Sequence, residues 1–271
     1  MVSCGKYLRF PEIWKRTSPI TICPFDDSLI SGSVAGLEDA TKKLESICSA
    51  RPTAILTFAG RIEKFPELFV GLRTIVNLSA STTRSSYTRK VQCGTIETAL
   101  RVNASAVAVH INIASVYAFE MIQHAVEVIE QAKRYDVPIC GIIYPRGEAG
   151  GQVDNFDEMR LKDPNGYGEL VAHCVHLGVD LGVDIIKTQY TGSKESFQLA
   201  VKAAGPVPIV VAGGPLVSEP IALAYAVDAV QAGAAGISFA RNVFGRNDPK
   251  RFIDMLRLGM ADGLRPSRKR A

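Results

Sequence analysis

Short runs of apolar and β-branched residues alternate along the chain with segments in which apolar residues recur at helical spacing. Such runs are typical of strands, and the segments between them are typical of helices. The predicted strands cover residues 20–26, 54–58, 74–79, 106–113, 138–144, 184–190, 208–214 and 236–242. The predicted helices cover residues 34–49, 63–72, 92–103, 115–135, 166–182, 193–204, 217–232 and 248–261. The chain is therefore expected to repeat a strand–helix unit.

This alternation predicts an α/β fold with a parallel sheet. Strands such as AVAVHINI and PIVVAGG are apolar almost throughout, which indicates burial on both faces beneath helices. Eight units in roughly 240 residues favour a closed (β/α)₈ barrel over an open sheet. We expect one domain over residues 1–271, with the barrel at about 18–262, a short N-terminal extension and a basic C-terminal tail.

Some local signals refine this picture. Asn247-Asp248-Pro249 and Ser218-Glu219-Pro220 predict capped starts for the last two helices. Residues 146–168, after the fifth strand, form a polar, glycine-rich connection. A connection of that length in a barrel is often functional, so we expect a loop that takes part in the site.

Composition and charge indicate an ordinary globular protein. Hydrophobic residues make up 47% and charged residues 21%, which disfavours disorder, collagen-like repeats and coiled coils. The net charge is +4, and much of it comes from Arg265, Arg268, Lys269 and Arg270 near the C-terminus. A nucleic-acid-binding protein is expected to carry its basic face within the fold, so the tail is interpreted as a solvated end.

The chain is expected to be cytoplasmic, with neither a membrane nor nucleic acid as its partner. Its apolar runs fall short of the roughly 18 residues of a membrane span, and the N-terminus lacks the apolar stretch of a secretory signal. The six cysteines show no Cys-x-x-Cys spacing and are expected to be buried thiols. We therefore expect no metal site.

Strand ends are the places to look for chemistry, because the active site of a barrel lies where its strands end. Lys187 sits late in the sixth strand, among apolar neighbours. Burial lowers the pKa of a lysine and makes the neutral amine available as a nucleophile, which Schiff-base chemistry requires. A lysine paired with a carboxylate, or one that reaches the rim, remains an equally open interpretation.

Three more residues end neighbouring strands. Tyr144 ends the fifth strand, where a phenol could move a proton, or could simply be a rim aromatic. Asp26 and Asp27 end the first strand, and because side chains alternate along a strand we expect only one of them to face the barrel axis. That makes a paired-carboxylate mechanism a poor fit, and an aspartate here could equally cap a turn.

The last two strands end in residues suited to phosphate. Gly213 and Gly214 follow the seventh strand, and Ala240 and Arg241 end the eighth. Barrels commonly bind phosphate in this region through backbone N–H groups and a short helix, and Arg241 would add a charge-assisted hydrogen bond. The glycine pair alone is equally typical of a tight turn.

The histidines suggest little metal chemistry. His173 and His176 lie on a predicted outer helix and are interpreted as structural. His110 lies within the fourth strand near Asn112, so it is either a core histidine or a residue of the site, and we favour the site.

Five motifs together resemble a known superfamily. IIKTQYTG, VAGGP, ARNVFGR, IIYPRG and VHINIAS are similar to motifs of archaeal-type class I fructose-bisphosphate aldolases and of 2-amino-3,7-dideoxy-threo-hept-6-ulosonate synthases, in the DeoC/LacD superfamily. The resemblance spans residues 18–260. The segment VAHCVHLGVDLGVDIIKTQYTGSKESF is most similar to the aminoheptulosonate synthases.

The resemblance implies a metal-independent class I aldolase without a cofactor. It implies Lys187 as the Schiff-base lysine, Tyr144 as the proton donor and acceptor, and Asp26 as the aspartate of an Asp-His-Gly motif. By the same likeness Gly213, Gly214, Ala240 and Arg241 bind phosphate. We place His110, Asp27 and the Arg146 of IIYPRG with the substrate-binding residues. The partners implied are a phosphorylated ketone and an aldehyde acceptor, in a homo-oligomer, with pentamers or decamers known among such proteins.

Two departures from the family pattern bear on the substrate. Asp27-Ser28 stands where the family has His-Gly, and Ala240 replaces the usual glycine before Arg-Asn. The resemblance leaves several activities open: joining a ketone phosphate fragment to aspartate semialdehyde, cleaving a bisphosphorylated hexose, or a thiolase reaction on phosphorylated autoinducer-2. A non-catalytic module that binds a sugar phosphate is a further alternative.

Overall fold

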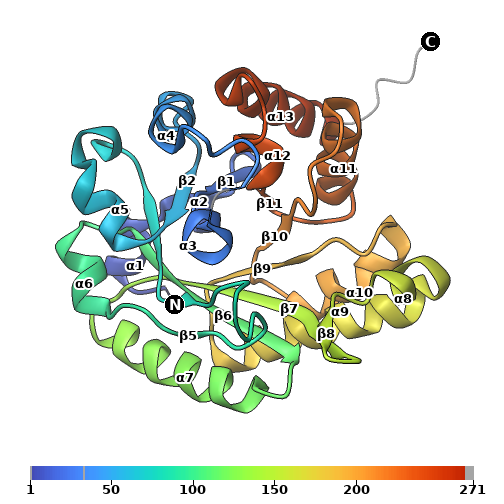
Figure 1. Ribbon diagram of the computed structural model, residues 1–271. Coiled ribbons are helices and arrows are strands. Elements are labelled where there is room, and N and C mark those ends of the chain that lie inside the picture. The colour runs from blue at the N-terminus through green and yellow to red at the C-terminus, as the bar shows by residue number, and fades with distance from the viewer. Residues whose placement is uncertain (1, 33, 266–271) are drawn as a thin grey trace, which may run out of the picture.

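Eight parallel strands form a closed barrel in the computed structural model, which describes residues 2–32 and 34–265 (Figure 1). The sheet order is β6-β3-β2-β1-β11-β10-β9-β7, and pairing of β6 with β7 closes the ring. The barrel strands are β1 (Ile20–Pro24), β2 (Ala54–Thr57), β3 (Thr74–Asn77), β6 (Ala106–Ala114), β7 (Ile139–Ala149), β9 (Ile185–Gln189), β10 (Ile209–Ala212) and β11 (Gly236–Ser238). The predicted (β/α)₈ barrel is confirmed.

Helices surround the strands on the outside (Figure 1). They are α4 (Ala40–Ser49), α5 (Ala59–Lys64), α6 (Ile96–Arg101), α7 (Ala118–Arg134), α9 (Pro164–Leu181), α10 (Lys194–Ala204), α11 (Glu219–Gln231) and α13 (Pro249–Gly263). The helix predicted at 63–72 is wrong in its bounds, because α5 ends before Pro66, which instead begins a 3₁₀ helix, η1 (Pro66–Phe69). Proline lacks the N–H that would have continued α5.

Side chains alternate between the two faces of each strand, and this divides the hydrophobic core into one layer inside the barrel and one between the strands and the helices. Ile185 belongs to an apolar cluster inside the barrel, whereas its neighbour Ile186 belongs to the larger cluster between strands and helices. This is the period of two that a pleated strand imposes. Because both faces of the sheet are covered, the strands are apolar on both, and only their ends are free for polar chemistry.

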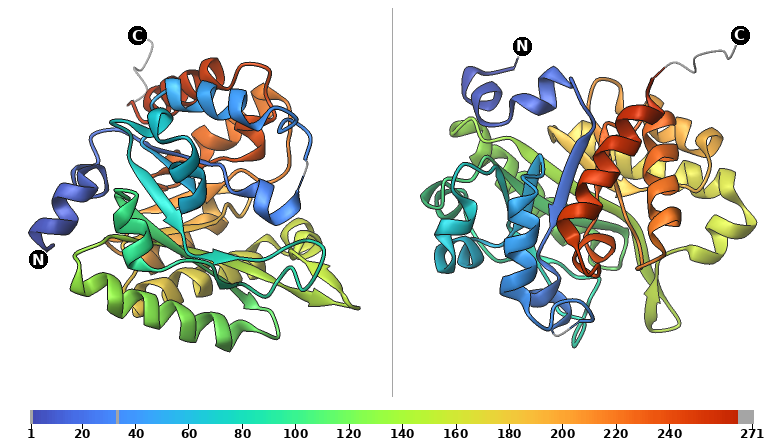
Figure 2. Two further views of the ribbon diagram at one scale, coloured as in Figure 1. Left: turned by 60° about the vertical axis from the view of Figure 1, so that its left-hand side comes forward. Right: turned by 90° about the horizontal axis from the view of Figure 1, so that it is seen from above.

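The N-terminal extension folds into two short helices, α1 (Cys4–Arg9) and α2 (Pro11–Lys15), which close one end of the barrel. Phe10 and Ile13 join the interior cluster. Lys6 Nζ lies 2.8 Å from the Asp184 carboxylate, just before β9. Figure 2 shows these helices at the end opposite the hairpin at residues 147–154. The open end of the barrel is therefore the one at which the strands finish.

Replacing Phe10 by alanine is expected to lower the free energy of unfolding by about 3–5 kcal/mol, because a fully buried ring would leave a cavity. Phe10 is 0% exposed. Denaturant-induced unfolding measures the change. Leu8→Ala is the matched control, because Leu8 lies on the adjoining α1 and is 70% exposed. Equal losses in the two variants would show that α1 and α2 do not seal the barrel.

The two predicted helix caps have different outcomes. Asp248 accepts a hydrogen bond from Arg251 N at the start of α13, as predicted. Ser218 occupies the corresponding position of α11 but makes no capping hydrogen bond, so that prediction is wrong. Pro220 is the second residue of α11 and has no N–H, which removes one of the donors that a capping side chain uses.

Much of the segment predicted as a loop at 146–168 is regular structure. β7 continues to Ala149 and turns into the antiparallel β8 (Gln152–Asp154), and α8 (Asp157–Lys162) follows. The turn consists of Gly150 and Gly151, both with positive φ, which is the two-residue geometry that matches the twist of a hairpin. A second excursion lies between β4 (Ser79–Ala80) and β5 (Val91–Gln92). Both excursions rise from the strand ends.

The remaining predictions concern cysteines, membranes and the tail. All six cysteines are free; four are buried as expected, and Cys4 and Cys93 are exposed. Within residues 2–32 and 34–265, no helix combines the length and apolar character that a membrane crossing requires. Of the predicted basic tail, Arg268, Lys269 and Arg270 lie outside the described residues.

Candidate active site

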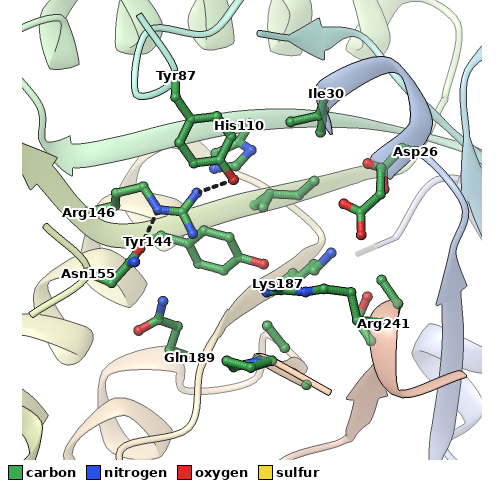
Figure 3. Close-up of a pocket in the computed structure, with 18 of the residues that line it drawn as sticks. Asp26, Ile30, Tyr87, His110, Tyr144, Arg146, Asn155, Lys187, Gln189 and Arg241 are labelled. Atoms are coloured by element: carbon green, nitrogen blue, oxygen red, sulfur yellow. Dashed lines mark hydrogen bonds between the residues drawn. The ribbon is translucent and has the colours of Figure 1, made fainter. Parts of the chain in front are cut away.

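A cavity of about 220 Å³ opens where the strands end, and it brings together every residue singled out for the site. Figure 3 shows Lys187 near its centre, with the Tyr144 hydroxyl pointing toward it. The residues predicted from the sequence that line the cavity are Asp26, Asp27, His110, Tyr144, Arg146, Lys187, Gly213, Gly214, Ala240 and Arg241.

Strand register explains why these side chains meet. Lys187 pairs with Ile142 on β7 and with Val210 on β10, and Ile142 in turn pairs with His110 on β6. Residues in register point the same way, so His110 and Lys187 lie in one layer of the barrel interior. Tyr144 is two residues beyond Ile142 and faces inward one layer closer to the mouth.

Lys187 is 7% exposed, and the ion pairs among residues 2–32 and 34–265 do not include it. The expectation that burial would lower its pKa is wrong in direction. Burial favours the neutral amine, but the neighbouring ionisable groups, Tyr144 first and then Asp26, act in the opposite direction, and together they raise the pKa of Lys187. This shift favours the ammonium form, which must lose a proton before the amine can attack a carbonyl.

Neighbouring side chains hold the ring of Tyr144, whereas its hydroxyl forms no hydrogen bond with the residues that the structure describes. The ring packs edge-on against His110, with centroids 5.1 Å apart, and the Arg146 guanidinium lies 5.2 Å from its centre. Burial, opposed by the positive charges of Lys187 and Arg146, raises the pKa of Tyr144. The phenol is therefore protonated near neutral pH and is ready to donate.

Both Asp26 and Asp27 line the cavity, although alternation predicted that only one would face it. β1 ends at Pro24, before either aspartate, and Asp27 begins α3 (Asp27–Ser31), so the period of two no longer applies. Asp26 precedes α3 without capping it and instead accepts a hydrogen bond from Asn77 Nδ2 at 3.0 Å. Burial and the neighbouring charge of Asp26 raise the pKa of Asp27 to about 6.

The region predicted to bind phosphate is a backbone loop, and the side-chain amide of Asn242 holds it in place. Asn242, on the short helix α12 (Arg241–Phe244), donates to the carbonyl oxygens of Gly213 and Pro215 at 2.9 and 2.8 Å. A Cβ on Gly213 would lie 2.8 Å from the Phe239 ring, so only glycine fits there. Gly214 has φ +66°, which also favours glycine. The loop is thus preorganised before any ligand arrives.

Several lining residues were missed from the sequence. Lys90 and Tyr87 come from the excursion before β5, and Ser238 and Gln189 come from the ends of β11 and β9. The Ser238 hydroxyl is buried without a hydrogen-bond partner, which leaves it free for a ligand. Its position, two residues before Ala240 on an inward face, was the signal that could have identified it. Lys90 carried no such signal, because its segment lacks periodicity.

The structure places His110 apart from His173 and His176. His110 lies in the cavity, where its Nε2 is 3.1 Å from Asn112 Oδ1. Burial and then the charges of Lys90, Arg146 and Lys187 lower the pKa of His110 well below its usual value, so the ring is neutral. His173 and His176 are exposed on α9, away from the mouth. Within residues 2–32 and 34–265, no three His, Cys, Asp or Glu side chains are grouped to hold a metal ion.

Comparisons with known proteins extend the likeness over nearly the whole chain. A model of DeoC/LacD family aldolases matches residues 20–246. The 2-amino-4,5-dihydroxy-6-oxo-7-(phosphonooxy)heptanoate synthase of Streptomyces griseus is 37% identical over 238 residues, covering 87% of this chain and 82% of that protein. The 2-amino-3,7-dideoxy-D-threo-hept-6-ulosonate synthase of Halobacterium salinarum is 34% identical over 250 residues, covering 92% and 89%.

Solved structures agree with the sequence relatives. An archaeal fructose-1,6-bisphosphate aldolase, whose catalytic lysine is covalently bound to the carbinolamine intermediate of its substrate, has a TM-score of 0.81 to this chain. The two are 27% identical, and the match covers 94% of this chain and 99% of that structure. The resemblance inferred from five short motifs therefore holds for sequence and fold alike.

Proposed function

The chain belongs to the DeoC/LacD family of aldolases and is a class I enzyme, and on that premise we propose that Lys187 is the amine that attacks the substrate carbonyl. The observation that carries the proposal is the position of Lys187. It is a buried lysine in the cavity at the strand ends, beside a phenol and two carboxylates, and it belongs to no ion pair of the described residues. A structural lysine in this position would have a carboxylate partner.

The proposed chemistry begins with transfer of a proton from the Lys187 ammonium to Asp26 or Asp27, the two carboxylates of the cavity. The free amine adds to the ketone carbon and forms a carbinolamine. Loss of water then gives an iminium ion, which withdraws electrons from the adjacent carbon. Tyr144, left as a phenolate by that loss of water, takes a proton from this carbon and gives an enamine, which forms the new C–C bond by adding to an aldehyde. Water then hydrolyses the product iminium, which releases the product and the Lys187 amine. Cleavage runs the same steps in reverse.

Tyr144 and Asp26 are proposed to move the protons. The phenol donates to the carbinolamine hydroxyl as it leaves as water, and it can take a proton back when the C–C bond changes. Asp26, held by Asn77, orients or deprotonates a substrate hydroxyl. General acid–base contributions of this kind are each worth about 10²–10⁴-fold in rate.

The proposed substrate is a phosphorylated ketone, with an aldehyde as its reaction partner. Its phosphate would bind the backbone N–H groups around Gly213, Gly214 and Ala240, with Arg241 adding a charge and Ser238 a hydroxyl. The names of the two synthases give a phosphorylated heptanoate and a heptulosonate as their products, and that of the archaeal aldolase gives fructose 1,6-bisphosphate. Anchoring the phosphate places the ketone carbon within reach of Lys187, which lowers the entropic cost of bringing the two reacting groups together.

Borohydride trapping tests the proposal. In the presence of dihydroxyacetone phosphate, reduction should attach the ketone, minus one oxygen atom, to the peptide that contains Lys187, as read by mass spectrometry. Dihydroxyacetone without phosphate should label it more slowly, because it lacks the anchoring group. Lys187→Ala should take up no label. Labelling of that variant to the wild-type extent, or of another lysine, would contradict the assignment.

A further inference from the structure

A second cavity lies beside helix α3, apart from the one that holds Lys187. It has a volume of about 450 Å³, and the described residues that line it differ from those around Lys187. Helix α3 forms a wall of both: Asp27 and Ile30 face the cavity of Lys187, whereas Ser28 and Leu29 line the second one. The other wall comes from α5, so we refer to this second cavity as the α3–α5 groove. Figure 1 shows α3 toward the centre of the barrel and α5 on its outside.

The walls of the groove are mainly apolar. Phe58 and Phe65, which flank α5, line it together with Phe25 and with Leu29 of α3, and Leu29 is 48% exposed. Small-molecule sites in proteins are typically concave spaces of about 300–1,000 Å³ with apolar and aromatic walls and a few polar groups. The size and the walls of this groove match that description.

Arg61 is a polar group that the aromatic walls hold in place. Its guanidinium lies 5.6 Å from the centre of the Phe25 ring and 5.8 Å from that of the Phe65 ring. Its Nη2 donates to Ser28 Oγ at 3.3 Å. A guanidinium has five N–H donors, so Arg61 keeps donors for a ligand. Because the rings and Ser28 already restrict this side chain, little conformational entropy remains to be lost on binding.

The charged side chains of the groove are both positive. Lys64, the last residue of α5, joins Arg61 in the lining, and no aspartate or glutamate among the described residues lines the groove. The ion pairs formed within residues 2–32 and 34–265 include neither Arg61 nor Lys64. Two cations beside an apolar wall favour a ligand that has an apolar body and a negative charge.

The contact between Arg61 and Ser28 is particular to this chain. Ser28 stands where the family has glycine, which has no hydroxyl to accept a hydrogen bond. The same departure places Asp27 in the cavity of Lys187. Both faces of α3 therefore differ from the family pattern.

From this combination we infer that the α3–α5 groove binds a small aromatic anion, with its ring against Phe58 and Leu29 and its carboxylate or phosphate on Arg61 and Lys64. The anion would accept charge-assisted hydrogen bonds from the guanidinium, whose fork of donors fits two oxygens at once. The ring would cover apolar surface that is otherwise in contact with water. Because α3 separates the groove from Lys187, this ligand is a third molecule beside the two reactants, and the inference does not depend on the chemistry at Lys187.

Isothermal titration calorimetry with a set of related probes tests the inference. 3-Phenylpropanoate and phenyl phosphate carry both a ring and a negative charge. Among the control probes, 3-phenylpropan-1-ol lacks the charge, propanoate lacks the ring, and 3-phenylpropylammonium reverses the charge. We expect at least one of the aromatic anions to bind with Kd below about 1 mM, and about tenfold or more tighter than each control probe. The aromatic anion that binds tighter identifies the anionic group that the groove prefers.

Arg61→Met and Phe58→Ala are the test variants, and Arg134→Met, at the exposed end of α7, is the matched control. Arg61→Met should weaken binding of the preferred aromatic anion about 10–100-fold, as expected for a charged hydrogen bond. Arg61→Lys, which keeps the charge but not the fork of donors, should recover part of the affinity. Phe58→Ala should weaken binding about 2–10-fold, as expected for the loss of an aromatic pair. Arg134→Met should bind every probe as the wild type does.

The α3–α5 groove is the wrong site if Arg146→Met or Arg241→Met, both in the cavity of Lys187, weakens binding as much as Arg61→Met does. The inference also fails if neither aromatic anion binds more tightly than the control probes. It fails equally if Arg61→Met and Phe58→Ala, shown to be folded by circular dichroism, both bind like the wild type. Should Arg61→Met not fold, Arg61→Lys and Phe58→Ala decide in its place, and unchanged binding in both overturns the inference.

Discussion

Replacing Lys187 by methionine or by arginine is expected to lower kcat by about 10⁴-fold or more, because the covalent intermediate can no longer form. Methionine keeps the length of the side chain without an amine. Arginine keeps the positive charge next to Asp26 and Asp27 but does not give up its proton in proteins. Comparison of the two variants separates the effect of losing the nucleophilic amine from the effect of losing the positive charge. Steady-state aldol cleavage and synthesis both report the loss.

The arginine variant is the more discriminating of the two. If Lys187 only neutralised its carboxylate neighbours, Lys187→Arg would retain most of the activity, and Lys187→Met would lose it through a raised pKa of Asp27. Circular dichroism and thermal unfolding show whether each variant is folded. Activity above about 1% of the wild type in a folded Lys187→Arg would be incompatible with an amine nucleophile.

Removing the Tyr144 hydroxyl is expected to have the second largest effect. Tyr144→Phe keeps the ring against His110 and Arg146 but deletes the proton donor, so kcat should fall about 10²–10⁴-fold. The KM for the phosphorylated ketone should change far less, because the residues proposed to bind the phosphate follow β10 and β11, away from Tyr144 on β7. Borohydride should still trap substrate on Lys187, only more slowly, since the amine is intact.

Tyr135→Phe is the control for this substitution, because it removes a hydroxyl from the exposed end of α7, where it donates to Glu97. It should leave kcat and KM unchanged. If Tyr144→Phe retained more than about a tenth of the wild-type kcat, another group would have to move the proton. A fall in kcat with an equal rise in KM would instead point to misplaced substrate.

The barrel could be predicted because the sequence patterns that indicate its strands and helices are local and recur along the chain. Each strand is apolar on both faces, and each helix follows within a few residues, so pattern and topology agree. The same regularity placed Lys187, Tyr144 and Arg241 near the mouth, although neither Tyr144 nor Arg241 ends a strand as predicted. Tyr144 lies within β7, which continues to Ala149, and Arg241 begins α12 after β11 has ended at Ser238. The β7–β8 hairpin was interpreted as a loop because a Gly-Gly pair such as Gly150-Gly151 is typical of a hairpin turn and of an irregular loop alike.

Other features depend on contacts that sequence patterns do not encode. Lys90 lies in a polar, aperiodic stretch that would normally be solvated, and it becomes buried only because that stretch packs beside a hairpin from far along the chain. The pKa of Lys187 depends on Tyr144 and on carboxylates from other strand ends, so burial alone predicted the wrong direction for its shift. Both the burial of Lys90 and the pKa of Lys187 are therefore determined by neighbours that are distant in the sequence.

The inward face of β7 has a consequence for how such an enzyme can diverge. Ile142, Tyr144 and Arg146 alternate along this one strand and line the pocket, and Cys140 continues the same inward face into the apolar cluster below it. Inserting or deleting one residue within the strand would turn every inward side chain beyond that point to the other face of the sheet. Lineages of this fold should therefore change β7 by substitution, and gain or lose length at the Gly150-Gly151 tip.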